Sequence, residues 1–436
     1  MDLVSTPDRS LAPPAPAPRV AHWRAHLRQR REALRSEFVE RPDPRRLLRG
    51  LARLVDEIVR SVAHEASLPA IAAVVAVGGY GRGELFPHSD VDILILLPQA
   101  SDDACTESIE RLVSSLWDIG VELSHSVRTP AECETEMIAD ATIRTSILER
   151  RFIAGSRRLY GDFDLAMNRA LDVASFYDAK ALEQQQRHLK YHDAAYNLEP
   201  NVKESPGGLR DLQSVIWIAR ALGVGRSWHE LAANGLITLG EARAVARQER
   251  AISELRIRLH YLAGRREDRL VFDLQAALAR ALGLVDTKAK LATEQLMQRY
   301  YRAAKVVRQV NTILLQNLHA RLYPAATQPI PIDADFQRVD ELLDARDPHL
   351  FEMRPGAMLD AFLTLQRHAE LRGMSAETLR ALWRNRGRID AAFRRDPANR
   401  ARFLQIFREP RGLTHELRRM NLYGILGHYL PSFGAI

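Results

Sequence analysis

The chain has 436 residues, 46% of them apolar and 27% charged, which is typical of a soluble globular protein with two or three domains. Two cysteines, Cys105 and Cys133, exclude a disulfide framework or zinc cluster and favour a reducing cytoplasm. With no basic start before an apolar stretch and no run of membrane-spanning length, neither a signal peptide nor a membrane protein is expected. The net charge of +7 allows a nucleic-acid partner, but arginine-rich helix faces in solvent explain it more simply.

The N-terminal region predicts a tail followed by helices. Residues 1–20, with the run L-A-P-P-A-P-A-P, bury little apolar surface and predict a disordered tail. From Trp23 to Phe38 apolar residues recur at helical spacing. Asp43 then serves as the N-cap, and Pro44 as the first residue, of a second helix.

A pair of aspartates stands at the start of a predicted strand. Two apolar, β-branched runs, Ile71–Val77 and Val91–Leu97, read as buried strands. Asp90 and Asp92 open the second of them, and residues two apart on a strand point to the same face. Two neighbouring carboxylates at the edge of a core need a cation, and hard oxygen ligands suit Mg²⁺ or Mn²⁺.

The segment between these strands is rich in glycine. Gly78 and Gly79 let the backbone approach a ligand closely, as glycine does where a phosphate is bound. Other glycine-loop motifs do not fit, because the chain has no G-x-x-x-x-G-K-[ST] and its spacing is G-x-G-x-G rather than G-x-G-x-x-G. A phosphate-binding turn beside a metal-binding carboxylate pair indicates phosphoryl or nucleotidyl transfer.

A third carboxylate has two candidates. After a predicted helix over Asp103–Asp118, the run Val121–Val127 predicts a third strand, in which Glu122 lies between apolar neighbours. That arrangement is expected if Glu122 joins the aspartate pair, whereas a solvent-facing glutamate is the simpler alternative. Glu149, in a helical stretch over Thr142–Arg151, is the main rival.

Beyond residue 164 the pattern becomes helical, with helices predicted over Phe176–His192, Leu212–Leu222 and Gly240–Leu262. Between the first two lies the turn Pro206-Gly207-Gly208. Lys203 and Arg210 on either side of it could hold phosphate oxygens. By composition alone, an ordinary interhelical loop with solvated charges is the favoured interpretation.

The remaining pattern completes the expected domain organisation. A long helix carries an apolar stripe from Leu296 to Leu314, which indicates core packing, and three prolines over Pro324–Pro331 end it. We therefore expect a nucleotide-handling domain with N-terminal helices over residues 21–163, a helical domain over 164–322 and a shorter helical section over 323–436.

These motifs resemble known families. The string Gly78-Gly79 … Ser89-Asp90-Val91-Asp92 between two strands resembles the nucleotidyltransferase superfamily that includes DNA polymerase β. Together with Trp117-Asp118-Ile119-Gly120, His125-Ser126-Val127-Arg128 and Lys203–Asp211, it resembles the bifunctional uridylyltransferase/uridylyl-removing enzymes that modify the PII nitrogen-signalling protein in bacteria. His260-Tyr261-Leu262, Gly264–Leu270 and Gln298–Tyr301 also resemble that family, so the similarity runs from about Trp23 to the end.

The resemblance implies a fold and a chemistry. The fold would be α+β, a polymerase β-like nucleotidyltransferase domain with a small mixed sheet followed by an all-α domain. UTP would be the donor and a tyrosine hydroxyl of PII the acceptor, with two Mg²⁺ ions, or Mn²⁺, in the site. The implied metal ligands are Asp90, Asp92 and Glu122, and the implied nucleotide contacts are Gly78, Gly79, Arg82, Ser89, Lys203 and Arg210.

One departure from the family bears on activity. Family members continue into a metal-dependent HD phosphohydrolase domain and two small-ligand-sensing ACT domains, whereas this sequence ends where the first should begin. His192-Asp193 is the one adjacent His-Asp pair, in a predicted helix without spaced partners. We therefore expect uridylyl transfer without hydrolytic removal or glutamine sensing. Two alternatives remain open: an RNA nucleotidyltransferase of the CCA-adding or poly(A) type, and a non-catalytic PII-binding module.

Overall fold

The computed structural model of the chain describes residues 18–99, 103–191, 198–324 and 328–435. It divides into two compact units. Unit 1 comprises residues up to Leu171 together with Gly264–Arg266, and unit 2 comprises Asp172–Ala263 and the chain from Glu267 onward. The predicted pair His192-Asp193 and most of the predicted 1–20 tail lie outside the described residues, whereas Pro18 already begins a helix.

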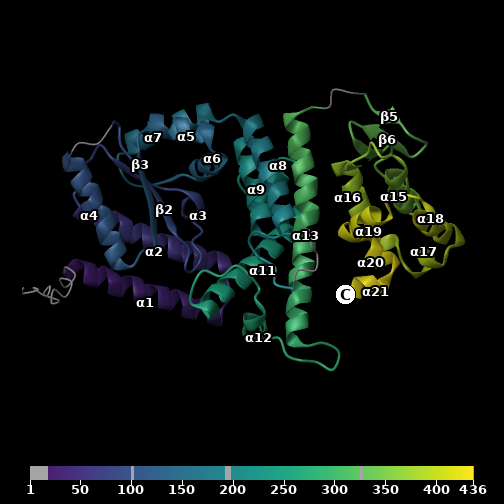
Figure 1. Cartoon of the computed structure of the whole chain (residues 1–436), viewed down its shortest axis with the longest axis horizontal. Helices are drawn as coiled ribbons and strands as arrows, with labels where there is room; N and C mark the ends of the chain where they lie inside the picture. The colour runs from purple at the N-terminus through teal and green to yellow at the C-terminus, as the bar shows by residue number, and fades with distance from the viewer. Residues whose placement is uncertain (1–17, 100–102, 192–197, 325–327, 436) are drawn as a thin grey trace, which may run out of the picture. The chain divides into compact units, whose positions relative to one another are not determined.

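Unit 1 is built on a four-stranded mixed sheet in the order β3-β2-β1-β4 (Figure 1). β2 pairs in parallel with β3 and antiparallel with β1, which pairs antiparallel with β4. The strands predicted at Ile71–Val77 and Val91–Leu97 are confirmed. The four strands are β1 (Ala73–Ala76), β2 (Val91–Leu96), β3 (Leu123–Arg128) and β4 (Arg151–Gly155).

Helices cover both faces of this sheet. Leu94 and Leu96 of β2 pack in one core with residues of α5, α6 and α7, while α2 contacts β4 and α4 contacts β3. The Asp43 N-cap predicted for the second helix is confirmed, since its carboxylate accepts the amides of Arg45 and Arg46. The helices are α1 (Pro18–Glu40), α2 (Pro44–Glu65), α3 (Gly78–Gly81), α4 (Asp103–Ile119), α5 (Pro130–Ala139), α6 (Ala141–Leu148) and α7 (Arg157–Ala170).

Two sequence predictions for unit 1 were wrong. The helix predicted over Thr142–Arg151 ends at Leu148, because Arg151 already begins β4. The domain boundary predicted at 163/164 falls inside α7, which belongs to unit 1 as far as Leu171. The reason is packing, since Phe163 and Met167 of α7 are buried in the core formed with β1 and β2.

Unit 2 begins with helices at the predicted places (Figure 1). The long predicted helix is α13, whose stripe from Leu296 to Leu314 is buried, as expected for core packing. The helices are α8 (Val173–Lys190), α9 (Leu209–Ala221), α10 (Trp228–Ala233), α11 (Leu239–Ala263), α12 (Phe272–Ala281) and α13 (Ala292–Leu322).

The section after residue 323, predicted as helical, also contains a second sheet in the order β5-β6-β7-β8. Its strands span two to four residues, too short to show a period in the sequence. Ile313 of α13 lies in the same apolar core as this section, so the section belongs to unit 2. Its elements are β5 (Ile330–Pro331), β6 (Phe336–Val339), β7 (Leu342–Ala345), α14 (Leu350–Met353), α15 (Ala357–Arg367), β8 (Gly373–Met374), α16 (Ala376–Asn385), α17 (Ala391–Arg395), α18 (Pro397–Arg408), α19 (Leu413–Leu422), α20 (Ile425–Tyr429) and α21 (Pro431–Ala435).

Within the described ranges, no helix combines the length and apolar character that crossing a membrane requires.

Candidate active site

The two predicted aspartates lie at the start of β2 in unit 1. Asp92 is partly buried and shares its strand face with Leu94 and Leu96. Asp90, two residues earlier, is exposed. One carboxylate therefore stands at the border of the core and the other in solvent, so a ligand can approach the pair from outside.

The glycine turn α3 lies directly beside Asp92. Gly78 has a positive φ of +57°, and a Cβ built on it would lie 3.1 Å from Asp92 Oδ2, so a larger residue here meets both backbone strain and a close carboxylate. The amide of Val77, just before the turn, donates to the carbonyl of Asp92 (3.1 Å). Gly79 follows in the same turn, and Ser89 is partly buried just ahead of Asp90. The structure thus brings Gly78, Gly79 and Asp92 together as predicted from the motif.

Arg82 makes ion pairs that the sequence analysis did not anticipate. Its Nη1 lies 2.5 Å from a carboxylate oxygen of Glu149, and its Nε lies 3.3 Å from Glu84 Oε2. Burial opposes the charge, yet the carboxylates of Glu149 and Glu84 raise the pKa of Arg82 above its ordinary value. The Arg82 guanidinium therefore supports the turn from its C-terminal side, and a nucleotide contact for it stays a prediction.

The two candidates for a third carboxylate lie in different environments. Glu149 is only 2% exposed, and its carboxylate forms an ion pair with Arg82. Glu122 is exposed and lies immediately before β3. Its backbone carbonyl accepts a hydrogen bond from the amide of Val91 (2.7 Å). Because Val91 of β2 pairs with Leu123 of β3, this register places Glu122 level with Asp90. These positions favour Glu122 as the carboxylate that reaches the aspartates.

The donor set fits a hard divalent cation only in part. In the portion of the chain that the structure describes, no three His, Cys, Asp or Glu side chains are gathered closely enough to hold a metal. Mg²⁺ is usually held by one or two carboxylates plus substrate phosphates. Asp90 and Asp92 beside the glycine turn satisfy that requirement, and Glu122 would complete the set only by turning toward them.

Asp90 is paired with an arginine. Nη1 of Arg266, in the short segment of unit 1 that follows α11, lies 3.1 Å from Asp90 Oδ2. Both side chains are about half exposed, at 53% and 55%. A guanidinium therefore neutralises the carboxylate that a metal ion would bind.

Replacement of Arg266 by Ala is expected to strengthen Mn²⁺ binding to the nucleotide-free protein two- to fivefold. An exposed ion pair is worth about 0–1 kcal/mol, and its removal frees Asp90 for the metal. Electron paramagnetic resonance titration of free Mn²⁺ measures this affinity, with Arg265→Ala as the neighbouring control. Unchanged or weaker binding in Arg266→Ala would show that the pair does not compete with the metal.

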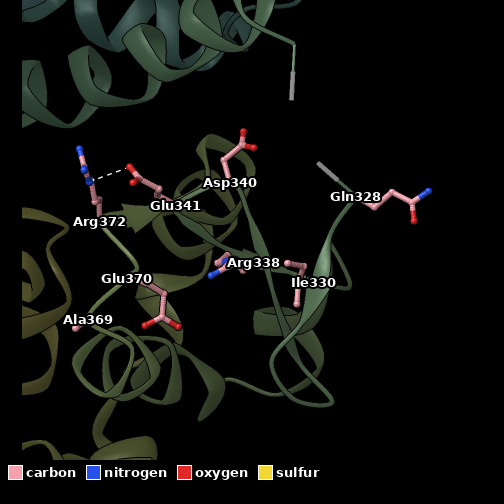
Figure 2. A pocket seen from close by; sticks show the side chains of 8 residues that line it. All are labelled: Gln328, Ile330, Arg338, Asp340, Glu341, Ala369, Glu370 and Arg372. Atoms are coloured by element: carbon pink, nitrogen blue, oxygen red, sulfur yellow. Dashed lines mark ion pairs between the residues drawn. The ribbon is translucent and has the colours of Figure 1, made fainter. Parts of the chain in front are cut away.

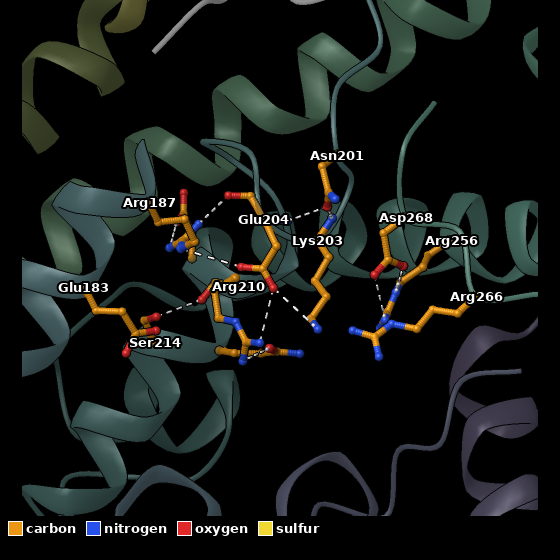
Figure 3. Close-up of polar contacts among 12 residues, drawn as sticks. Glu183, Arg187, Asn201, Lys203, Glu204, Arg210, Ser214, Arg256, Arg266 and Asp268 are labelled. Carbon is orange, nitrogen blue, oxygen red and sulfur yellow. Dashed lines mark hydrogen bonds and ion pairs between the residues drawn. The ribbon is translucent and has the colours of Figure 1, made fainter. Parts of the chain in front are cut away.

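Lys203 and Arg210 lie in unit 2, where both face Glu204 (Figure 3). Lys203 Nζ lies 3.4 Å, and Arg210 Nη2 3.2 Å, from Glu204 Oε1. The turn between them is structural: a Cβ on Gly207 would lie 2.4 Å from the carbonyl oxygen of Ala304 in α13. The cations, rather than the glycines, are therefore the groups available to a ligand.

A buried carboxylate fixes this loop. Asp211, fully buried, accepts the amide of Gly207 (2.7 Å) and a guanidinium nitrogen of Arg187 (2.6 Å), and its Oδ1 lies 2.9 Å from His188 Nε2. Arg187 also donates to the carbonyl of Glu204 (2.7 Å). The cations of the loop thus stand on a rigid base.

The sequence analysis assigned no role to Arg256 and Asp268, which lie close to Lys203 (Figure 3). Arg256 Nε lies 2.6 Å from Asp268 Oδ1. Burial, followed by the charges of Arg210 and Arg256, lowers the pKa of Lys203 to about 8. A bound anion would relieve this repulsion. The sequence signal was the Gly264–Leu270 string of the resemblance, which contains Asp268 but not Arg256.

A separate cavity lies in the section after residue 323 (Figure 2). Its volume is about 540 Å³, and Arg372 Nε pairs with Glu341 at 2.8 Å beside it. None of its lining residues is a predicted site residue; they are Gln328, Ile330, Arg338, Asp340, Glu341, Ala369, Glu370 and Arg372.

Comparison with known proteins defines the class of unit 1 first. A family model described as a nucleotidyltransferase domain matches residues 55–152, which contain the glycine turn, Asp90, Asp92 and Glu122. Two further models match the rest: GlnD PII-uridylyltransferase over residues 175–315, and the uridylyltransferase GlnD third domain over residues 336–429. The chain belongs to the GlnD uridylyltransferase family.

Several bacterial relatives are similar over nearly the whole chain, each named bifunctional uridylyltransferase/uridylyl-removing enzyme. That of Bordetella parapertussis is 52% identical over 415 residues, 94% of this chain and 48% of the relative. Those of Chromobacterium violaceum and Nitrosospira multiformis are 49% and 50% identical, covering 95% of this chain and 49% and 47% of the relatives. The chain spans about half the length of the curated relatives it matches.

Proposed function

We propose that this chain transfers a uridylyl group from UTP to a tyrosine hydroxyl of the PII signalling protein, with Mg²⁺ or Mn²⁺ as cofactor. The observation that carries the proposal is the glycine turn packed against Asp92, with Asp90 beside it, in a chain of the GlnD family. The two free cysteines are buried and fit a reducing compartment such as the cytoplasm.

The reaction assigns a task to each group. The acceptor oxygen bonds to the α-phosphorus of UTP, the bond from that phosphorus to the β-phosphate oxygen breaks, and pyrophosphate leaves. Asp90 and Asp92 hold the metal ions, which when bound stabilise phosphate charge and favour loss of the hydroxyl proton. Glu122 serves as the third carboxylate, as ligand or as base for that proton. Gly78, Gly79 and Ser89 hold the triphosphate.

The test is incubation of the chain with PII, Mg²⁺ and each of the four nucleoside triphosphates, read by the intact mass of PII. We expect the mass of one uridylyl group to be added with UTP and not with the other three. Retention of label on tRNA, with PII unmodified, would favour an RNA nucleotidyltransferase. Failure to bind any Mg²⁺–nucleotide by calorimetry would favour a non-catalytic PII-binding module.

In unit 2, Lys203 and Arg210 are proposed to bind UTP phosphate oxygens. Because the pKa of Lys203 is lowered to about 8, its charge is present at pH 7 and largely lost at pH 9. UTP affinity, measured by calorimetry, should therefore fall as pH rises through 8, by up to about tenfold per pH unit.

Lys203→Arg is the matched control for this dependence, because arginine keeps its charge throughout the range. We expect Lys203→Arg to bind UTP with a flat profile, and Lys203→Met to bind more weakly with an equally flat one. The same slope in Lys203→Arg as in the unmodified chain would assign the titration to another group. Unchanged affinity in both Lys203→Met and Arg210→Ala would make this loop purely structural.

A further inference from the structure

The carbonyl end of the glycine turn α3 is held by an arginine from β4. Arg151 donates from Nη2 to the carbonyl of Tyr80 (3.0 Å) and from Nε to the carbonyl of Gly81 (3.2 Å). Its guanidinium also lies over the Tyr80 ring, 5.2 Å from the centroid. One side chain thus binds two consecutive carbonyls of the turn and packs on the ring of Tyr80.

A buried carboxylate orients that arginine. Asp56 of α2, 7% exposed, accepts from both terminal nitrogens of Arg151, at 2.7 Å and 3.0 Å. This two-pronged geometry restrains the guanidinium in both position and plane. Arg60 is the second cation near Asp56, 3.5 Å away and 52% exposed, and its Nε donates to the carbonyl of Ile153 rather than to the turn.

Both ends of the turn have little freedom. Gly78 lies against Asp92, and the Cβ position of Gly81 lies 2.0 Å from the carbonyl oxygen of Glu149. Movement of the turn therefore changes the spacing between the Gly78–Gly79 backbone and the Asp92 carboxylate. Tyr80 is fully buried, and burial followed by the charge of Asp56 raises its pKa well above the ordinary value, so it remains a neutral packing group.

We propose that the Asp56–Arg151 ion pair positions the glycine turn, setting the place of the nucleotide-binding backbone relative to Asp92. Arg151 and Asp56 are thus positioning residues, acting through α3 without touching the nucleotide. The inference deepens the proposed function and rests on it for the identity of the ligand. A displacement of about 1 Å in such a site can cost about a hundredfold in rate.

Three variants and a matched control test the inference. Arg151→Gln removes the charge and the paired donors, Arg151→Lys keeps the charge with a single donor group, and Asp56→Asn leaves the guanidinium without its orienting carboxylate. Arg60→Gln is the control, because it removes a cation from the same carboxylate but no contact with the turn. The measurements are the KM for UTP and kcat with PII as acceptor. Hydrogen exchange of residues 78–85 in the nucleotide-free protein is followed as well.

In Arg151→Gln we expect the KM for UTP to rise, so that kcat/KM for UTP falls about ten- to a hundredfold, and exchange of residues 78–85 to accelerate. In both the KM for UTP and the exchange rate of residues 78–85, Arg151→Lys and Asp56→Asn should lie between Arg151→Gln and the unmodified chain. Arg60→Gln should match the unmodified chain in both quantities. If Arg151→Gln does not fold, Arg151→Lys and Asp56→Asn decide by the same two measurements.

The positioning role would be overturned if Arg60→Gln had the same effect as Arg151→Gln. It would also be overturned if Arg151→Lys and Asp56→Asn both showed a normal KM for UTP and normal exchange of residues 78–85. Failure of the proposed function gives a different result, since the unmodified chain would then not add uridylyl groups to PII and no KM or kcat for that reaction could be measured. Exchange of the turn in the nucleotide-free protein would still report whether Arg151 holds it.

Discussion

The Asp92→Asn variant is expected to lose at least about three orders of magnitude in uridylyl transfer to PII while keeping its fold. The amide removes the negative charge that binds and positions the metal, and loss of a group acting in the transition state lowers kcat. Thermal stability should hold or rise slightly, because a neutral side chain at position 92 no longer repels the neighbouring Asp90 carboxylate. The rate is measured by the intact mass of PII and the fold by thermal unfolding.

Asp162→Asn is a matched control for Asp92→Asn. Asp162 is an exposed aspartate on α7 of the same unit, so its variant makes the same chemical change away from the glycine turn. We expect this control to transfer at the normal rate. Near-normal transfer by Asp92→Asn at saturating Mg²⁺ would mean that the reaction does not take place at β2.

Local patterns in the sequence predicted the parts of the site that are close together along the chain. Gly78 and Asp92 lie at neighbouring ends of the adjacent strands β1 and β2, so the two strand predictions together with the glycine motif place them near one another. The Asp43 N-cap was equally predictable, because the amides that donate hydrogen bonds to its carboxylate, those of Arg45 and Arg46, lie within three residues of it.

Long-range charge pairs could not be predicted in this way. Arg82 and Glu149 are 67 residues apart, and Arg151 and Asp56 are 95 apart. Neither pair has a period or motif, and with 62 lysines and arginines in the chain any one arginine is most simply interpreted as solvated. Only the folded structure shows which of them pair with a buried carboxylate.

Glu122→Gln and Glu149→Gln are expected to fail in different ways. Glu122→Gln should lower the transfer rate by at least about two orders of magnitude, because a ligand or base acts on the transition state. Since Glu122 is exposed, the free energy of unfolding of the Glu122→Gln variant should equal that of the unmodified chain. Glu149→Gln should lower that free energy by roughly 2–4 kcal/mol, because Arg82 loses a buried charged partner while Glu84 remains.

The roles of Glu122 and Glu149 are distinguished by measuring the transfer rate and the free energy of unfolding on the same samples. Transfer is assayed well below the unfolding temperature of Glu149→Gln and expressed per folded molecule, and unfolding is followed in urea. Glu149→Gln should then retain most of its rate. The reverse ranking would place the Glu149 carboxylate in the reaction and require Arg82 to release it when nucleotide binds. The parallel register of β2 and β3, which sets Glu122 level with Asp90, would then have no part in catalysis.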